Sequence, residues 1–119
     1  MGRRSRRRAN QGTRPTAATT DYTDAEGNVL TLRDELSAGT LRALQDLDAK
    51  PAASAEDRWQ RRVELLFERL AVRWTIADLP IESQKELLGR YRLASSSERQ
   101  QVREALAQHL AARHPEIDL

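Results

Sequence analysis

The most concentrated chemistry in this sequence is a group of arginines near the N-terminus. The first twenty residues contain no acidic side chain. Six arginines fall within the first fourteen residues: Arg3, Arg4, Arg6, Arg7, Arg8 and Arg14. A guanidinium group forms bidentate hydrogen bonds with phosphate, and each phosphate contact releases counterions, which makes the binding salt-dependent. The spacing matches no groove-reading helix, and no aromatic side chain interleaves the arginines, so we expect contact with phosphates rather than with bases.

These six arginines predict an arm that contacts nucleic acid or another polyanion. A segment of this composition has too few large apolar side chains to offset the entropy of ordering, so we expect it to be disordered when free. The same composition would also suit a tail that solubilises the protein or contacts an anionic surface, or an arm that runs along a partner protein or RNA within an assembly.

Other residue types that could do chemistry do not occur at catalytic spacings. Glu64 and Glu68 are four residues apart on an expected helix, as are Glu82 and Glu86, and basic residues surround both pairs. Ion pairs on an exposed helix explain these carboxylates better than the desolvated cleft that acid–base catalysis requires. The sequence therefore predicts no enzyme and no catalytic residue.

Metal and cofactor sites are not expected either. Residues 24–29 imitate the middle of a calcium-binding EF-hand loop, but Tyr22 and Arg33 stand where its first and twelfth ligands belong, so a β-turn is the better interpretation. His109 and His114 are five residues apart, a spacing that does not place them together on one helix face. Cysteine is absent, and the five glycines are scattered. We expect no metal, no cofactor and no small-molecule substrate.

The elements that must position these groups are organised around residues 58–74. Apolar residues recur there at steps of three and four, which predicts one long α-helix: Trp59, Val63, Leu66, Leu70 and Trp74. The two tryptophans would then lie about 22 Å apart on one face. Trp59 and Trp74 are candidate partner-binding residues if an end of this stripe is uncovered, and complete burial in the core is the alternative.

Further elements are expected on either side of the central helix. A β-hairpin is expected over about 21–33, with Gly27 or Asn28 at positive φ in its turn. Helices are expected over 37–49, about 79–93 and 96–113 from the spacing of their apolar residues. The expected N-terminal caps of the four helices are Ser37, Ser54, Asp78 and Ser95, the last in a capping box with Glu98.

Together these elements predict a mainly α fold: a small bundle of about four helices, preceded by a short β-hairpin and a disordered basic N-terminal arm. The expected boundaries are 1–20 for the arm and 21–119 for a single helical domain that includes the hairpin. Charge divides at the same boundary, because the first twenty residues carry +6 while the remaining ninety-nine carry −4, from 14 basic and 18 acidic residues.

The sequence favours a non-enzymatic bacterial interaction protein whose helical body docks a macromolecular partner while the arm contacts a polyanion. A protein partner or homo-oligomer is possible. The longest apolar runs are about three residues, far below a membrane span, and no apolar signal region follows the arginines, so we expect a soluble, cytoplasmic protein without membrane contact.

Two alternatives of other classes stay open. A small helical body with a basic arm would suit a prophage or virion assembly component, for example one resembling a tail chaperone. The helices over 79–93 and 96–113 are separated by a short turn, as in a helix-turn-helix DNA-binding regulator. That regulator would have to read DNA through Arg99, Gln100 and Arg103.

Overall fold

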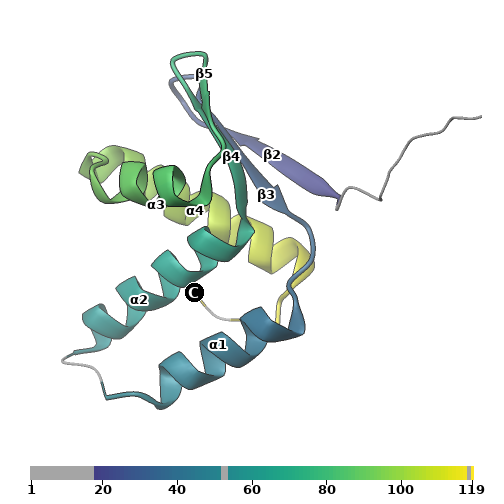
Figure 1. Ribbon diagram of the computed structural model, residues 1–119, viewed down its shortest axis with the longest axis vertical. Coiled ribbons are helices and arrows are strands. Elements are labelled where there is room, and N and C mark those ends of the chain that lie inside the picture. Colours follow the sequence, from purple (N-terminus) through teal and green to yellow (C-terminus); the bar gives the residue numbers. More distant parts are fainter. Residues whose placement is uncertain (1–17, 52–53, 118) are drawn as a thin grey trace, which may run out of the picture.

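The described chain combines four α-helices with a four-stranded antiparallel sheet (Figure 1). The computed structural model describes residues 18–51, 54–117 and 119. In chain order the elements are β2 (Thr19–Thr23), β3 (Val29–Arg33), α1 (Ala38–Ala49), α2 (Ala55–Leu70), β4 (Ala71–Ile76), β5 (Leu79–Ile81), α3 (Gln84–Arg92) and α4 (Ser96–Arg113). The fold is therefore α+β, and the predicted mainly α bundle with only a short hairpin is wrong.

The sheet has the strand order β2-β3-β4-β5, and each neighbouring pair is antiparallel. The expected hairpin forms its first half, with Thr23 paired to Val29 and Gly27 at φ 84° in the turn. Glycine has no Cβ and adopts this backbone conformation without steric cost. Strand β2 begins at Thr19, so it overlaps the last two residues of the range 1–20 that was assigned to the arm.

Helix α2 is shorter than predicted because residues 71–76 form strand β4. The helix ends at Leu70, and Ala71 already has an extended backbone with φ −70° and ψ 125°. Thr75 and Ile76 are β-branched, which favours a strand. Trp74 packs into the core on the covered face of the sheet. Trp74 follows Leu70 by four residues, the spacing of one more helical turn. The prediction that the helix continues to Trp74 was wrong for this reason.

A second hairpin replaces the expected helix start at Asp78. Strands β4 and β5 are joined by two residues, Ala77 and Asp78, with φ 51° and 67°. Positive φ at both central residues is the geometry of a type I′ turn, whose twist matches that of the flanking strands. Helix α3 begins only after Ser83, whose hydroxyl accepts a hydrogen bond from the backbone N–H of Glu86.

The predicted starts of the other three helices are confirmed by their caps. The hydroxyls of Ser37, Ser54 and Ser95 each accept a hydrogen bond from the backbone N–H three residues later. Ser95 and Glu98 form a complete capping box. Each cap satisfies an N–H group of the first helical turn that has no partner within the helix.

The core lies between one face of the sheet and helices α2, α3 and α4. Phe67 is fully buried, and its ring centroid lies 5.8 Å from that of Trp74 and 5.1 Å from that of Tyr91. The largest fully buried side chains are Leu32, Val63, Leu66, Phe67, Leu70, Leu106, His109 and Leu110. Helix α1 packs alongside α2 rather than on the sheet (Figure 1), so it extends the core at one end.

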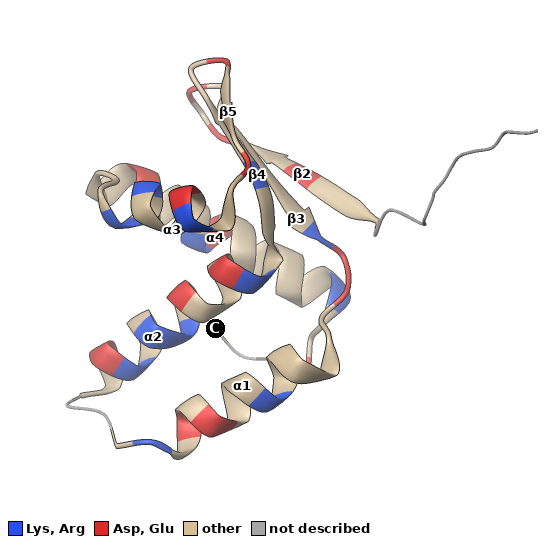
Figure 2. Ribbon diagram, in the orientation of Figure 1, with Lys and Arg blue, Asp and Glu red and all other residues tan. Residues whose placement is uncertain are grey.

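Charged residues are distributed over all four helices (Figure 2). Several join neighbouring helices: Arg62 lies 2.7 Å from Asp48 of α1, and Arg92 of α3 lies 2.8 Å from Glu64 of α2. In the described part of the chain, no helix has both the length and the apolar character needed to span a membrane.

Candidate functional site

The six arginines predicted to bind a polyanion lie outside the described residues: Arg3, Arg4, Arg6, Arg7, Arg8 and Arg14. The described chain starts at Ala18, whose carbonyl oxygen accepts a hydrogen bond from the backbone N–H of Asp34 at 2.9 Å. The arm is therefore attached at the start of edge strand β2, beside the end of β3.

The two candidate partner-binding tryptophans occupy different elements. Trp74 lies on β4, is 3% exposed and packs edge-on against Phe67 in the core. Trp59 lies on α2, is partly exposed, and has the guanidinium of Arg103 5.1 Å from its ring centroid. The prediction that Trp59 and Trp74 lie on one face of a single helix was therefore wrong. Partner binding stays a prediction for both residues, and the accessible ring of Trp59 supports it better than the buried ring of Trp74.

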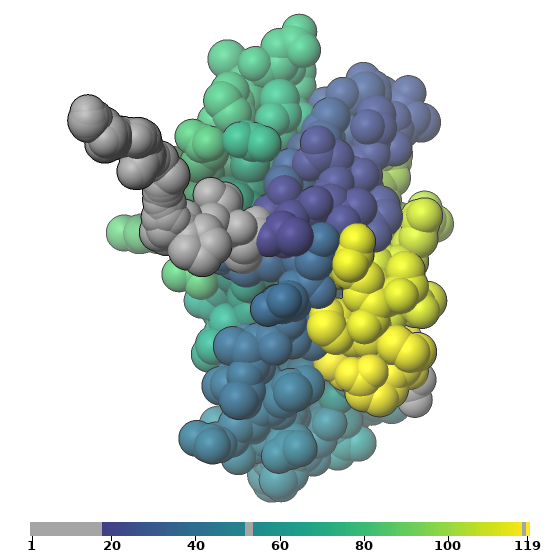
Figure 3. Space-filling model, turned by 90° about the vertical axis from the view of Figure 1, so that its right-hand side faces the viewer, coloured from purple at the N-terminus to yellow at the C-terminus, as the bar shows by residue number. Residues whose placement is uncertain are grey.

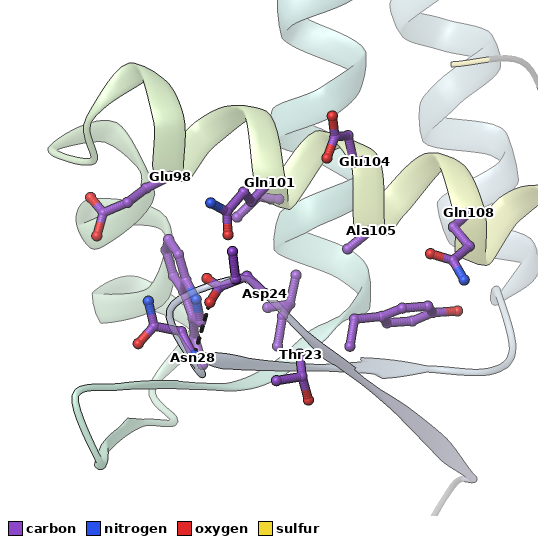
Figure 4. Close-up of a pocket in the computed structure, with 13 residues that line it drawn as sticks. Thr23, Asp24, Asn28, Glu98, Gln101, Glu104, Ala105 and Gln108 are labelled. Atoms are coloured by element: carbon purple, nitrogen blue, oxygen red, sulfur yellow. Dashed lines mark hydrogen bonds between the residues drawn. The ribbon is translucent and has the colours of Figure 1, made fainter.

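A cleft of about 330 Å³ lies between the turn of the β2–β3 hairpin and helix α4 (Figure 4). Its base is apolar and includes Leu30, Trp74 and Val102, all of which belong to the core. Its polar lining comes from the turn and from α4, segments far apart in sequence: Asp24, Asn28, Glu98, Gln101, Glu104 and Gln108. Side chains from these two elements face each other across the cleft, as Asp24 and Gln101 do in Figure 4.

The turn side of the cleft is held in place by Asp24. Its Oδ1 accepts hydrogen bonds from the backbone N–H groups of Glu26 and Asn28, both at 2.9 Å, and its carbonyl oxygen accepts one from Gly27 at 3.1 Å. This is the segment that resembles an EF-hand loop, and its interpretation as a β-turn is confirmed. The Asn28 side chain in turn accepts a hydrogen bond from the backbone of Ala77 at 3.1 Å, which ties the two hairpin turns together.

Two polar side chains define the helix side. The backbone N–H of Ser95 donates to Glu98, and the guanidinium of Arg90 lies 2.8 Å from it; both contacts lower the pKa of the Glu98 carboxyl group. Gln101 donates from Nε2 to Glu26 at 3.1 Å, a contact that links α4 to the hairpin turn. Its Oε1 is buried without a hydrogen-bond partner among the described residues.

A buried histidine lies next to the cleft. His109 is fully buried, and its Nε2 lies 2.7 Å from the carbonyl oxygen of Arg33. A carbonyl only accepts, so Nε2 carries the proton, and Nδ1 of the neutral ring accepts a hydrogen bond from the Tyr22 hydroxyl at 2.8 Å. His109 is therefore part of the core, with both ring nitrogens hydrogen-bonded. The ring of His114 contacts the carbonyl oxygen of Asp34 rather than the end of its own helix.

Burial lowers the pKa of His109 because the charged imidazolium loses its hydration. The hydrogen bond to Arg33 and the charge of Asp34 oppose this shift, while Arg113 and His114 add to it. Burial likewise raises the pKa of Tyr22, whose hydroxyl donates to His109. The pair is therefore neutral in the folded chain around pH 7.

This arrangement predicts acid sensitivity near neutral pH. An unfolded histidine titrates near pH 6.5, above the lowered pKa of folded His109, so below that pH the unfolded state binds more protons. We expect the free energy of unfolding to fall as pH drops below 6.5, by up to about 1.4 kcal/mol per pH unit. Urea denaturation between pH 7 and about 5.5 would measure it. The slope should disappear in His109→Gln and persist in His114→Gln; equal slopes in wild type and His109→Gln would contradict the assignment.

A second, more polar groove of about 240 Å³ lies between α2 and the start of α4. Trp59 and Val63 line it from α2, and Arg99 and Arg103 line it from α4. Because the Arg103 guanidinium stacks on the Trp59 ring, this groove holds the accessible tryptophan beside two cations. This groove is the surface through which Trp59 would contact a partner.

Within the described chain, one carboxylate of each pair considered for catalysis has an ion-pair partner, and that partner lies on another element rather than on the same helix as expected. Glu64 lies 2.8 Å from Arg92, and Glu82 lies 3.5 Å from Arg73. Each of these carboxylates therefore has a cation beside it at the surface of the folded domain.

No protein family, curated protein or solved structure matches this chain. The cleft is the feature that sequence reasoning missed. One local signal was available: Glu98, Gln101 and Gln108 recur along α4 at helical spacing, next to its apolar face. The other wall of the cleft comes from the hairpin turn, and local spacing does not reveal that contact.

Proposed function

We propose that this chain is a non-enzymatic interaction protein of the bacterial cytoplasm. Its folded α+β domain docks a macromolecular partner, and its arginine-rich arm contacts nucleic acid or another polyanion. This role needs no metal, cofactor or small-molecule substrate.

The observation that carries this proposal is the separation of charge along the chain. The first twenty residues carry +6, and the rest carry −4. Lysine and arginine are absent from the described lining of the larger cleft, which carries the carboxylates of Asp24, Glu98 and Glu104. A polyanion is repelled by such a surface and attracted by the arm, so the arm is the part of the chain best suited to bind it.

Docking of a partner is supported by apolar side chains that the described fold leaves exposed. Leu79 at the tip of the β4–β5 hairpin is 71% exposed, and Leu93 after α3 is 86% exposed. Trp59 adds an accessible aromatic ring. Single exposed leucines are common on protein surfaces, so the tryptophan groove is the stronger support for a protein partner.

The salt dependence of binding by the full-length chain tests the polyanion contact. Fluorescence anisotropy with a labelled single-stranded RNA and a labelled DNA duplex would give the dissociation constant Kd at several salt concentrations. If all six arginines contact phosphates of the duplex, log Kd should rise with log salt at a slope of about 5, and the slope for the single strand should be about 4. Absence of binding at low salt, or a slope near zero, would overturn the proposed contact.

A component of a prophage or virion assembly, resembling a tail chaperone, is the second candidate. It is favoured by the free edges of the sheet, since β2 and β5 each pair with a single strand among the described residues. An exposed edge strand can pair with a strand of a neighbouring subunit. This candidate requires a discrete oligomer or a complex with a structural protein, which light scattering after size exclusion would detect.

The helix-turn-helix alternative is less well supported. Helices α3 and α4 are joined by only three residues, 93–95, as that motif requires. However, α4 packs on the sheet through its apolar face, and Arg103 is stacked on Trp59. Loss of sequence-selective DNA binding on replacing Arg99, Gln100 and Arg103 together is the result that this alternative requires.

A further inference from the structure

The cleft between the β2–β3 turn and α4 contains hydrogen-bond acceptors that lack donors. Gln101 Oε1 is buried and has no partner among the described residues, while Nε2 of the same side chain donates to Glu26. Asp24 uses Oδ1 to hold the turn, and within the described chain no hydrogen bond reaches its Oδ2. Leaving a buried acceptor such as Gln101 Oε1 without a donor is unfavourable. The cleft therefore favours a ligand that brings several donors.

The charge around the cleft is negative and mostly unpaired. Of the four carboxylates that line or adjoin it, at Asp24, Glu26, Glu98 and Glu104, only Glu98 has a cationic partner among the described residues, Arg90 at 2.8 Å. The base of the cleft is apolar. An arginine side chain matches both features, because its hydrocarbon stem covers apolar surface while its guanidinium offers five donors and a fixed positive charge.

We propose that this cleft binds an arginine side chain of the chain's own N-terminal arm. The arm supplies six arginines, and its charge is opposite to that of the cleft. The consequence for binding rests on the proposed function: an arm held in the cleft is withdrawn from the polyanion, so the cleft and the polyanion compete for the same arginines.

The arm is long enough to reach the cleft. It is attached before Thr19, and the cleft lies at the other end of β2, five residues or about 17 Å away. Arg8 precedes Ala18 by ten residues, which span up to about 34 Å when extended. Strand β2 and helix α4, which border the cleft, lie side by side on one face of the molecule (Figure 3). No rearrangement of the described fold is needed to bring an arginine to this site.

The tether also makes a weak contact significant. A short flexible linker gives an effective concentration in the millimolar range. A contact between one guanidinium and this cleft with a dissociation constant of similar size would then be occupied about half of the time. If two of the arginines reach the site with this effective concentration, the occupancy rises to about two thirds. The affinity for a polyanion is reduced by the fraction of chains with a free arm, here about threefold.

Nuclear magnetic resonance of the full-length chain tests the contact directly. The reporters are the side-chain amides of Asn28 and Gln101 and the indole N–H of Trp74, all of which line the cleft. Their shifts should differ between wild type and a variant with all six arm arginines changed to glutamine. The difference should vanish at about 0.5 M salt, where charge contacts are screened. The indole of Trp59, outside this cleft, should not change.

Identical shifts in wild type and the arm variant would overturn the proposal. Shift differences that grow with protein concentration would also overturn it, because they would assign the arm to the cleft of a second copy. Neither result depends on nucleic-acid binding. A chain that shows the shift difference but binds no polyanion would refute the proposed function while leaving the cleft contact intact.

Charge-neutral substitutions in the cleft test the competition. Asp24→Asn with Glu26→Gln keeps the hydrogen-bond acceptors of the turn and removes two charges, and Asp46→Asn with Glu86→Gln is a matched control at exposed sites outside the cleft. The cleft variant should bind labelled single-stranded RNA about threefold more tightly at low salt, and the control should match wild type. An equal gain in both variants would show general electrostatics and refute competition at the cleft.

Discussion

Changing Arg3, Arg4, Arg6, Arg7, Arg8 and Arg14 together to glutamine should lower the affinity of the chain for nucleic acid by at least about a thousandfold at about 50 mM salt. A protein with six phosphate contacts loses about a thousandfold in affinity when salt rises from about 50 to 200 mM, because each contact contributes through counterion release. Removing all six contacts should therefore cost at least as much. Fluorescence anisotropy with labelled duplex and single-stranded probes would measure it. The folded domain should be unchanged, since the described core lies within residues 22–119.

A variant with the same six positions changed to lysine is the matched control. It keeps the charge and should keep most of the salt dependence, whereas a large loss would show that the planar guanidinium itself is needed. If the glutamine variant binds as tightly as wild type, the folded domain carries the contact and the arm has another role. A variant with three arginines changed should lose about half of the salt slope.

Trp74→Ala should destabilise the fold by about 3–5 kcal/mol, whereas Trp59→Ala should cost about 1 kcal/mol or less. Trp74 is 3% exposed and packs against Phe67 with ring centroids 5.8 Å apart, so truncation leaves a cavity in the core. Trp59 is partly exposed, packs at the margin of the core and has the guanidinium of Arg103 5.1 Å from its ring centroid. Urea denaturation followed by circular dichroism would give both free energies of unfolding.

Small domains have only about 5–15 kcal/mol of stability, so Trp74→Ala could leave too little folded protein to measure. Trp74→Phe retains an aromatic ring and should cost about 1–2 kcal/mol, which keeps the comparison measurable. Similar costs at Trp59 and Trp74 would contradict the difference in burial between the two side chains. A binding assay with an identified partner should show the reverse order, with Trp59→Ala the more harmful substitution.

Local patterns in the sequence determined the parts of the fold that depend on neighbouring residues. The caps at Ser37, Ser54 and Ser95 are side-chain hydrogen bonds to a backbone N–H three residues away, and they were located from residue type and spacing alone. The hairpin turn needs a residue with positive φ, which glycine adopts without steric cost, and Gly27 has this conformation. Apolar spacing also predicted the helix over 96–113, which the structure confirms as α4.

Tertiary structure decided the sheet and the cleft. Trp74 follows Leu70 by four residues, a step that fits the next turn of a helix as well as the inner face of a strand, so spacing could not separate the two. The strand forms because β4 pairs with β3, which lies some forty residues earlier, and with β5 across a turn of Ala77 and Asp78, neither of them glycine. The cleft depends on the same non-local pairing, because the sheet holds the turn that contains Asp24 beside Gln101 of α4. These residues are far apart in sequence, so no local pattern predicts that they are close in the fold.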